Sequence, residues 1–344
     1  MTTAFGAALH VTNGDSAGDV IERSRFEGRV LSWQDVPHEG PLLPGTRRDF
    51  LHARAAFLAE EGWRDAATIR RALEGRDRKL LEALREGREV VLWFEHDMLD
   101  QLQLIEILSL AGEPDCNLTG LQLLNTDAVE GRPEFHGLGE LEPDELEPLW
   151  PLRRPVTPEL VELARAAWAA VRAPDPQAVV ALLDEDTAQL PFLAAALERF
   201  LEELPDVAGG LSRTERQLLE TLVEGPLTPP ELFVQSARRE VAPFLGDSWF
   251  WQRLARLARG QRPLVSTAGG APIPEPPPRG DTPAFVQTRF QLTDHGRAVL
   301  GGELDWVEAV GLDRWVGGTR LRPENDWRWS SRERELRAPS VESG

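Results

Sequence analysis

The sequence predicts an α/β fold with a mainly parallel sheet in its N-terminal domain, a helical middle segment and a C-terminal winged-helix-like domain. Four short apolar runs between residues 8 and 124 alternate with helical patterns, which is typical of a parallel sheet covered by helices. Residues 141–205 carry helical patterns only. Residues 211–300 read as three helices, two short strands and a closing helix, which is the winged-helix order.

The four predicted strands are residues 8–12, 29–33, 90–94 and 121–124. The run VVLWF, residues 90–94, is continuously apolar rather than alternating, as expected for a strand that is buried on both faces. Ser16 is the expected N-cap of the helix after the first strand. Residues 47–86 follow a helical pattern, and so do residues 99–110. We expect residues 1–140 to form this α/β domain, which binds the ligand or substrate.

Three further helices are predicted in the middle segment, residues 141–210, where no chemical motif occurs. They open at Thr157-Pro158, at Asp175-Pro176 and at Pro191, because a capping hydroxyl or a proline favours the first turn of a helix. The segment reads as a helical bundle or a helical cover.

The winged-helix-like domain is expected to span residues 211–330. Its third helix should present three arginines on an outward face, and these are the nucleic-acid-binding candidates if the domain binds DNA: Arg253, Arg256 and Arg259. The Pro/Gly-rich tongue, residues 271–284, is expected to be a mobile wing. Four tryptophans read either as an apolar clasp over the domain or as stacking platforms for bases: Trp306, Trp315, Trp327 and Trp329. Residues 331–344 are expected to be a disordered tail.

Composition excludes several classes of protein. The chain has 344 residues, and its single cysteine, Cys116, excludes an internal disulfide and a multi-cysteine zinc site. Its single lysine, Lys79, does not lie in a phosphate-binding P-loop motif. No run is long and apolar enough to span a bilayer, and the N-terminus lacks a signal-peptide pattern, so we expect a cytoplasmic protein without a membrane partner.

The negative charge is unevenly distributed. Residues 211–344 hold 18 arginines and 18 acidic residues, so the formal net charge of −19 lies entirely on residues 1–210. Phosphate backbones are repelled by such a surface. The N-terminal part is therefore a poor candidate for nucleic-acid binding, and its acidity is the ordinary property of a well-solvated surface.

Polar residues follow each of the four predicted strands. In parallel α/β sheets, ligands bind outside the carboxyl ends of the strands. The substrate-binding candidates are Asn13, Gly14, Asp15, Ser16, Asp35, Gln101, Asn125 and Asp127. The catalytic candidates are His38, Glu39, Glu95, His96 and Asp97, because histidine beside carboxylates is suited to general acid–base chemistry near neutral pH.

Plainer structural roles compete with these assignments. Asp97 or Asp100 can cap the helix that begins there, and NGDS, residues 13–16, can be a simple capped turn. His10 lies within a strand and reads as a core histidine, while His136 fits a structural role equally well. Motifs for serine nucleophiles, dinucleotides and zinc are absent. No cofactor is identified, although His with Asp and Glu also suits a divalent metal.

Several segments resemble a known family. LHVTNGDSAGDVI, VLSWQDVPHEGPLLPG, VVLWFEHDMLDQLQLIEIL, FHGLGEL, LPFLAAALERFLEELP, GLSRTERQLLE and DRWVGG occur in this order, and together they are similar to bacterial proteins of domain-of-unknown-function family 1835. The resemblance covers most of residues 7–330. It implies an N-terminal α/β domain and a winged-helix-like C-terminal region, and it places the candidate residues in recognisable segments without giving them roles.

Two functions remain open at this stage. The first is an enzyme, a hydrolase or transferase that acts on a small polar substrate, with or without a phosphate group, with acid–base or metal assistance. The second is a ligand-sensing transcriptional regulator or protein-interaction module, in which the winged helix binds DNA or a protein partner. DNA binding is the weaker alternative, because the C-terminal region has no net charge and adjoins an acidic region that repels phosphate backbones.

Overall fold

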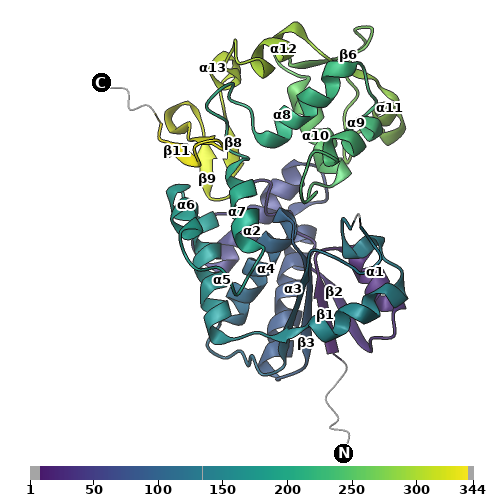
Figure 1. Ribbon diagram of the computed structural model, residues 1–344, viewed down its shortest axis with the longest axis vertical. Helices are drawn as coiled ribbons and strands as arrows, with labels where there is room; N and C mark the ends of the chain where they lie inside the picture. Colours follow the sequence, from purple (N-terminus) through teal and green to yellow (C-terminus); the bar gives the residue numbers. More distant parts are fainter. Residues whose placement is uncertain (1–7, 134, 340–344) are drawn as a thin grey trace, which may run out of the picture.

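The computed structural model describes residues 8–133 and 135–339 of the chain. A larger body holds the sheet and the first seven helices, and a smaller, mainly helical region lies at one end of it (Figure 1). The last strands of the chain, drawn in yellow, lie where the two regions meet (Figure 1).

The sheet has the strand order β2-β1-β3-β4-β5. The first four strands are parallel to their neighbours, and the two-residue strand β5 runs antiparallel to β4. This confirms the prediction of a mixed α/β fold with a mostly parallel sheet. The strands are β1 (Ala8–Thr12), β2 (Gly28–Ser32), β3 (Val90–Glu95), β4 (Leu121–Thr126) and β5 (Arg154–Pro155).

Helices cover both faces of this sheet. Val91 and Trp93 of β3 pack with α1 (Asp15–Arg23) and with the 3-10 helices η1 (Leu138–Glu140) and η2 (Pro143–Leu152). Leu92 and Phe94 face the opposite way, toward α2 (Arg47–Glu60), α3 (Ala66–Arg85) and α4 (Met98–Ala111). Successive side chains of a strand point to opposite faces, so the continuous apolar run of β3 fills both layers.

Two details of these helices differ from the prediction. The helical pattern of residues 47–86 is interrupted near Gly62, whose φ of +94° is a left-handed conformation that favours glycine. Helix α1 begins at Asp15, and its N-cap is Gly14, with no side-chain capping bond. The prediction that Ser16 caps this helix is therefore wrong, because Ser16 already lies inside the first turn.

The middle segment packs into the same core as the sheet. It contains α5 (Pro158–Val171), α6 (Gln177–Leu183) and α7 (Leu193–Leu201), and both α5 and α7 contact α4. The predicted opening of α5 is confirmed, since the Thr157 side chain accepts a hydrogen bond from the Leu160 N–H and Pro158 is the first helical residue. α4 is buried almost all round because it lies between the sheet and these helices.

The C-terminal region has a separate apolar core. Strands β6 and β7 pair antiparallel, and Leu227 forms an additional bridge with Phe290 of β7. The elements follow in the order α8 (Arg213–Thr221), η3 (Leu222–Glu224), α9 (Pro229–Ala237), α10 (Asp247–Leu257), β6 (Val265–Thr267), α11 (Thr282–Gln287), β7 (Phe290–Leu292) and α12 (Asp294–Leu300).

The tongue between β6 and β7 packs onto this core. Pro276 and Pro277 are buried, and Gln252 of α10 donates a hydrogen bond to the Pro277 carbonyl oxygen. The tongue leads into α11, whose Phe285 is fully buried against Phe290. The prediction that these residues form a mobile wing is wrong, because the segment carries its own apolar anchor.

The chain ends by returning to the larger body. It forms α13 (Trp306–Val310), the hairpin β8 (Arg314–Val316) with β9 (Thr319–Leu321), η4 (Pro323–Asn325), and the pair β10 (Arg328–Ser330) with β11 (Glu335–Arg337). Trp327 and Trp329 are buried in the core of the larger body, so they are not exposed stacking platforms, and they cover the larger body instead of the C-terminal domain over which the apolar clasp was predicted. The expected disordered tail is wrong for residues 335–337, which form β11, while residues 340–344 lie outside the described residues.

None of the helices in the described part of the chain is long and apolar enough to cross a membrane.

Candidate functional site

The carboxyl ends of β1 and β3 lie next to each other at the centre of the sheet. From β1 the chain moves outward to β2 on one side, and β3 and β4 follow on the other side. This reversal of strand order is the place where open α/β sheets bind ligands. Asn13, the first residue after β1, and Glu95, the last residue of β3, meet here, with 3.4 Å between Asn13 Nδ2 and Glu95 Oε2.

The Glu95 side chain is held by a backbone N–H group. Its Oε1 accepts a hydrogen bond of 2.5 Å from the N–H of Leu138, which belongs to the FHGLGEL segment. The side chain is buried, and burial raises the pKa of Glu95 to about 7, with the Asp97 carboxylate adding to the rise. A carboxyl group in this state exchanges a proton near neutral pH.

Asp97 and Asp100 belong to the N-terminus of α4. Asp97 is its N-cap, and its Oδ1 accepts the Asp100 N–H at 3.1 Å. Asp100 in turn accepts the Glu95 N–H through Oδ2 at 2.6 Å. Burial raises the pKa of both aspartates well above its usual value, and the neighbouring carboxylates raise it further. The capping role considered for Asp97 therefore coexists with its place in a cluster.

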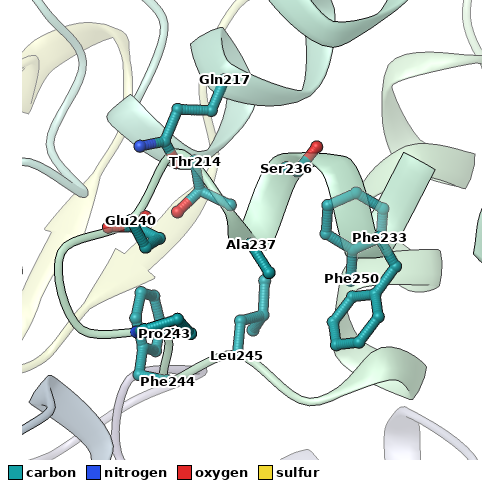
Figure 2. Close-up of a pocket in the computed structure, with 10 residues that line it drawn as sticks. All are labelled: Thr214, Gln217, Phe233, Ser236, Ala237, Glu240, Pro243, Phe244, Leu245 and Phe250. Carbon is teal, nitrogen blue, oxygen red and sulfur yellow. The ribbon is translucent and has the colours of Figure 1, made fainter. Parts of the chain in front are cut away.

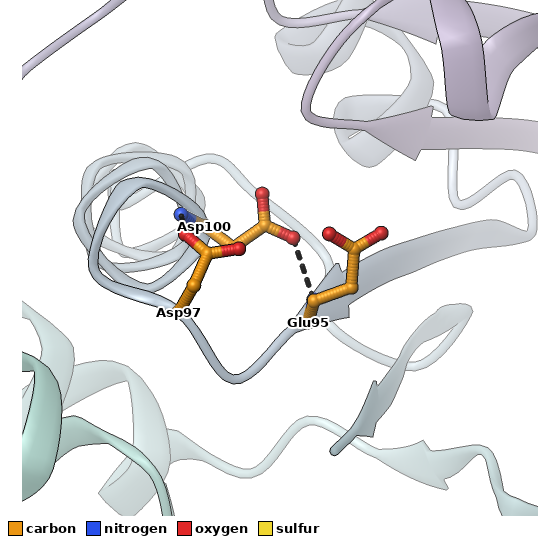
Figure 3. A group of neighbouring side chains, drawn as sticks. All are labelled: Glu95, Asp97 and Asp100. Atoms are coloured by element: carbon orange, nitrogen blue, oxygen red, sulfur yellow. Dashed lines mark hydrogen bonds between the residues drawn. The ribbon is translucent and has the colours of Figure 1, made fainter. Parts of the chain in front are cut away.

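The three carboxyl groups converge, with that of Asp100 between the other two (Figure 3). Each residue offers an oxygen, and these oxygens lie within 4.8 Å of one another. In the described part of the chain, no arginine or lysine pairs with any of the three. Three buried acids without a cation repel one another when ionised, so the cluster holds protons or a bound cation.

Three buried side-chain oxygens of the cluster and of two residues that bind the Glu95 main chain lack a donor. Asp100 Oδ1, Gln101 Oε1 and Asn125 Oδ1 are all buried without a hydrogen-bond donor among the described residues. The amide nitrogens of Gln101 and Asn125 both donate to the Glu95 carbonyl oxygen, at 2.6 and 3.1 Å. Buried acceptors are rarely left unpaired. Carboxylate and amide oxygens are the ligands of hard divalent cations such as Mg²⁺, Mn²⁺ and Ca²⁺.

The other predicted catalytic residue on β3's loop, His96, points elsewhere. It is half-buried against Phe192 of the segment before α7, with a T-shaped ring arrangement at 5.9 Å. Burial lowers its pKa, opposed by the charge of Asp127. Asp127 itself is exposed after β4. Neither residue belongs to the carboxylate cluster.

His38 and Glu39 lie in a different place, against the C-terminal region. Glu39 Oε1 accepts a hydrogen bond of 2.6 Å from Arg253 of α10, and Arg253 also binds Glu203. His38 is buried beside Phe244, and burial lowers the pKa of its ring to about 4. The five predicted catalytic residues are therefore not one constellation, since β1 separates β2 from β3 and the loops after these two strands contact different partners.

The prediction that the three arginines of the third helix form an outward face is wrong for Arg253. Arg253 does not face outward but is 7% exposed. Arg256 lies 3.8 Å from Glu39 and 3.5 Å from Glu61, and Arg259 lies 2.5 Å from Glu275. Each of the three arginines thus has a carboxylate partner within the chain, which reduces the positive charge available to a phosphate backbone.

Asp35 also has a structural partner. Arg54 binds it through a buried hydrogen bond of 2.6 Å, and the charges of Arg54 and Arg76 lower the pKa of Asp35 against the opposing effect of burial. Arg76 continues this network to Glu106 at 3.0 Å. Sequence patterns did not reveal these arginines, because charged residues on amphipathic helices are usually expected on the outside.

A groove of about 1140 Å³ adjoins the carboxylate cluster at Asn13. One wall is the start of α1, with Gly14, Asp15 and Ser16, and Asp35 also lines the groove, so five of the predicted binding residues line one cavity. The other wall is α3 and the turn before it. This wall contributes Trp63, Arg64 and Arg71, which sequence reasoning did not single out. Gln103 of the adjacent α4 also lines the groove and was not singled out either.

One other cavity is too small for a ligand. A cavity of about 30 Å³ in the C-terminal region lies between α8, α9 and the loop before α10 (Figure 2). This volume accommodates a water or two but no metabolite. Two further histidines that the sequence analysis considered lie outside the cluster: His10 accepts the Trp93 Nε1–H at 3.1 Å in the core, and the exposed His136 lies 3.6 Å from Glu140.

No protein-family model and no curated protein matches this chain.

Proposed function

We propose that the protein binds a hard divalent cation through Glu95, Asp97 and Asp100 and acts on a small phosphate-bearing substrate by hydrolysis or group transfer. The observation that carries this proposal is the convergence of three buried carboxyl groups without a cationic partner. The unpartnered oxygens of Gln101 and Asn125 add neutral ligands of the type that Mg²⁺ and Ca²⁺ accept.

The chemistry follows from the position of the cluster. A bound cation polarises a phosphoryl oxygen and lowers the pKa of a bound water. The carboxyl groups would hold the cation, and Glu95, whose pKa is near 7 without a cation, would lose its proton when the cation binds. Asn13 contacts Glu95 and also lines the groove, so a phosphate group in this part of the groove would lie beside the cation site.

Calorimetric titration with MnCl₂, MgCl₂ and CaCl₂ tests the cation site directly. We expect one site in the wild type and a loss of affinity in Asp100→Asn larger than the roughly 10–100-fold that removal of an outer-shell partner produces. Asp127→Asn is the matched control, because this aspartate is exposed and outside the cluster. Equal affinities of wild type and Asp100→Asn for all three ions would refute the proposal.

For the C-terminal region we propose a winged helix that acts as an interaction module rather than a DNA reader. The order of α8, α9, α10, β6 and β7 supports the winged helix. The docking of its third helix, α10, onto the larger body supports the interaction role, since Trp249 stacks on Phe57 and Arg253 pairs with Glu39.

Fluorescence anisotropy with labelled double-stranded DNA separates the two roles. The interaction role predicts no salt-dependent binding. Strong binding that weakens with salt and is lost in an Arg256→Gln, Arg259→Gln double variant would instead favour the regulator.

A further inference from the structure

The groove beside the carboxylate cluster has one acidic wall and one basic wall. Its floor is the outer edge of β2, its acidic wall is α1 and its basic wall is α3. On the basic wall, Arg64 and Arg71 form no ion pair with any carboxylate in the described part of the chain. Unpaired guanidiniums on the wall of a groove are suited to bind phosphate.

The start of α1 offers a second contact for an anion. Its N-cap, Gly14, provides no side-chain acceptor for the first N–H groups of the helix. A Cβ built on Gly14 would meet no atom within 4 Å, so the space above this turn is open. The Asp15 carboxylate, which also lines the groove, accepts a hydrogen bond of 2.6 Å from Gln34. The N–H groups and open space favour an anionic group here.

A buried, unsatisfied side chain in the same groove points to a ligand independently. Gln103 of α4 is 1% exposed and lines the groove. Its Nε2 donates to the Asp35 carbonyl oxygen at 2.6 Å, while its Oε1 has no donor among the described residues. A ligand with a hydroxyl or amino group would satisfy this acceptor.

The end of the groove next to the basic wall is aromatic. Trp63 lies just before Arg64, is 38% exposed and packs on Trp249 of α10 at 5.8 Å. An exposed indole that is held in place by a second indole is a platform on which a planar ring can stack.

We infer that the groove binds a nucleotide, with its phosphates between the start of α1 and Arg64 and Arg71, and its base against Trp63. This inference rests on the proposed function, for which it names the substrate class. Asp19 and Glu22 of α1 also line the groove, but Glu22 lies about 10 Å further along the helix than Asp15. Their charges repel phosphates from the lower part and leave the upper part, next to Asn13, as the anion site.

The test is calorimetric titration of the full-length protein with the nucleoside diphosphates ADP, GDP, CDP and UDP, and with pyrophosphate as the probe without a base. We expect at least one nucleoside diphosphate to bind more tightly than pyrophosphate. Arg71→Gln should weaken that binding about tenfold or more, and Trp63→Ala should weaken it roughly fivefold or more without changing pyrophosphate binding. Arg70→Gln is the matched control, because Arg70 is exposed next in sequence and pairs with Glu74 outside the groove.

Each outcome decides the inference. It is overturned if no nucleoside diphosphate binds, if pyrophosphate binds as tightly, or if Arg71→Gln and Arg70→Gln behave alike. Titrations with excess chelator and with Mn²⁺ distinguish a failure of the nucleotide inference from a failure of the proposed cation site. Mn²⁺ binding without nucleotide binding refutes the nucleotide alone, and nucleotide binding in a protein that binds no cation refutes the cation site alone.

Discussion

Replacing Glu95 by glutamine should make the protein more stable at alkaline pH. The pKa of Glu95 is raised from 4.5 to about 7 in the folded protein, so the folded state binds its proton more tightly than the unfolded state does. The contribution to stability is fully present below pH 4.5 and is lost as the pH rises through about 7. The shift corresponds to about 3 kcal/mol, and the isosteric Glu95→Gln variant cannot ionise.

Urea denaturation at pH 4.5 and pH 8.5, with a chelator present, measures this difference. The free energy of unfolding of Glu95→Gln relative to wild type should increase by up to about 3 kcal/mol between the two pH values. Addition of Mn²⁺ at pH 8.5 should stabilise the wild type far more than the variant. A relative stability that does not change with pH would show that Glu95 ionises in the folded protein as it does in water, and the account of the cluster would be wrong.

Three further outcomes are expected. Arg253→Met should lower the free energy of unfolding by up to about 3–5 kcal/mol, because the buried Glu39 loses its closest cationic partner and the buried Glu203 keeps only Arg199; a loss below about 1 kcal/mol in urea denaturation would contradict this. Mn²⁺ affinity should rise with pH through about 7 and release protons, as Glu95 deprotonates, which calorimetry in two buffers of different ionisation enthalpy detects. Thr157→Ala should lower the midpoint of thermal unfolding through the loss of about 1 kcal/mol of helix capping, and an unchanged midpoint would argue against that cap.

The sheet was predictable because its signal is local. A run such as that of β3 fills both faces with apolar side chains, and the four parallel strands begin within one residue of the predicted positions. The capping position of Asp97 was also predictable, since the three-residue spacing to Asp100 is that of an N-cap side chain and the backbone N–H that donates to it. The same spacing brings the two carboxyl groups together, so the cluster follows from a capping motif placed directly after a strand.

The separation of His38 and Glu39 from Glu95 could not be predicted in this way. The partner of Glu39 is Arg253, 214 positions along the chain, and no local pattern specifies a contact of that length. The burial of Arg253 likewise depends on the docking of α10. Arg54 and Asp35 lie in the core as a matched pair, whereas helical periodicity treats every charged residue as solvent-facing.

The return of the last strands to the larger body has a consequence for synthesis of the chain. Trp327 and Trp329 complete the core to which Leu9 and Val11 belong. Domains of a nascent chain tend to fold in order from the N-terminus, but here the first body remains open until its C-terminal tryptophans have left the ribosome. The C-terminal region, whose core is separate, can close earlier although it is translated later than the sheet. Chains that stop before residue 327 would expose apolar surface and become targets for chaperones and proteases.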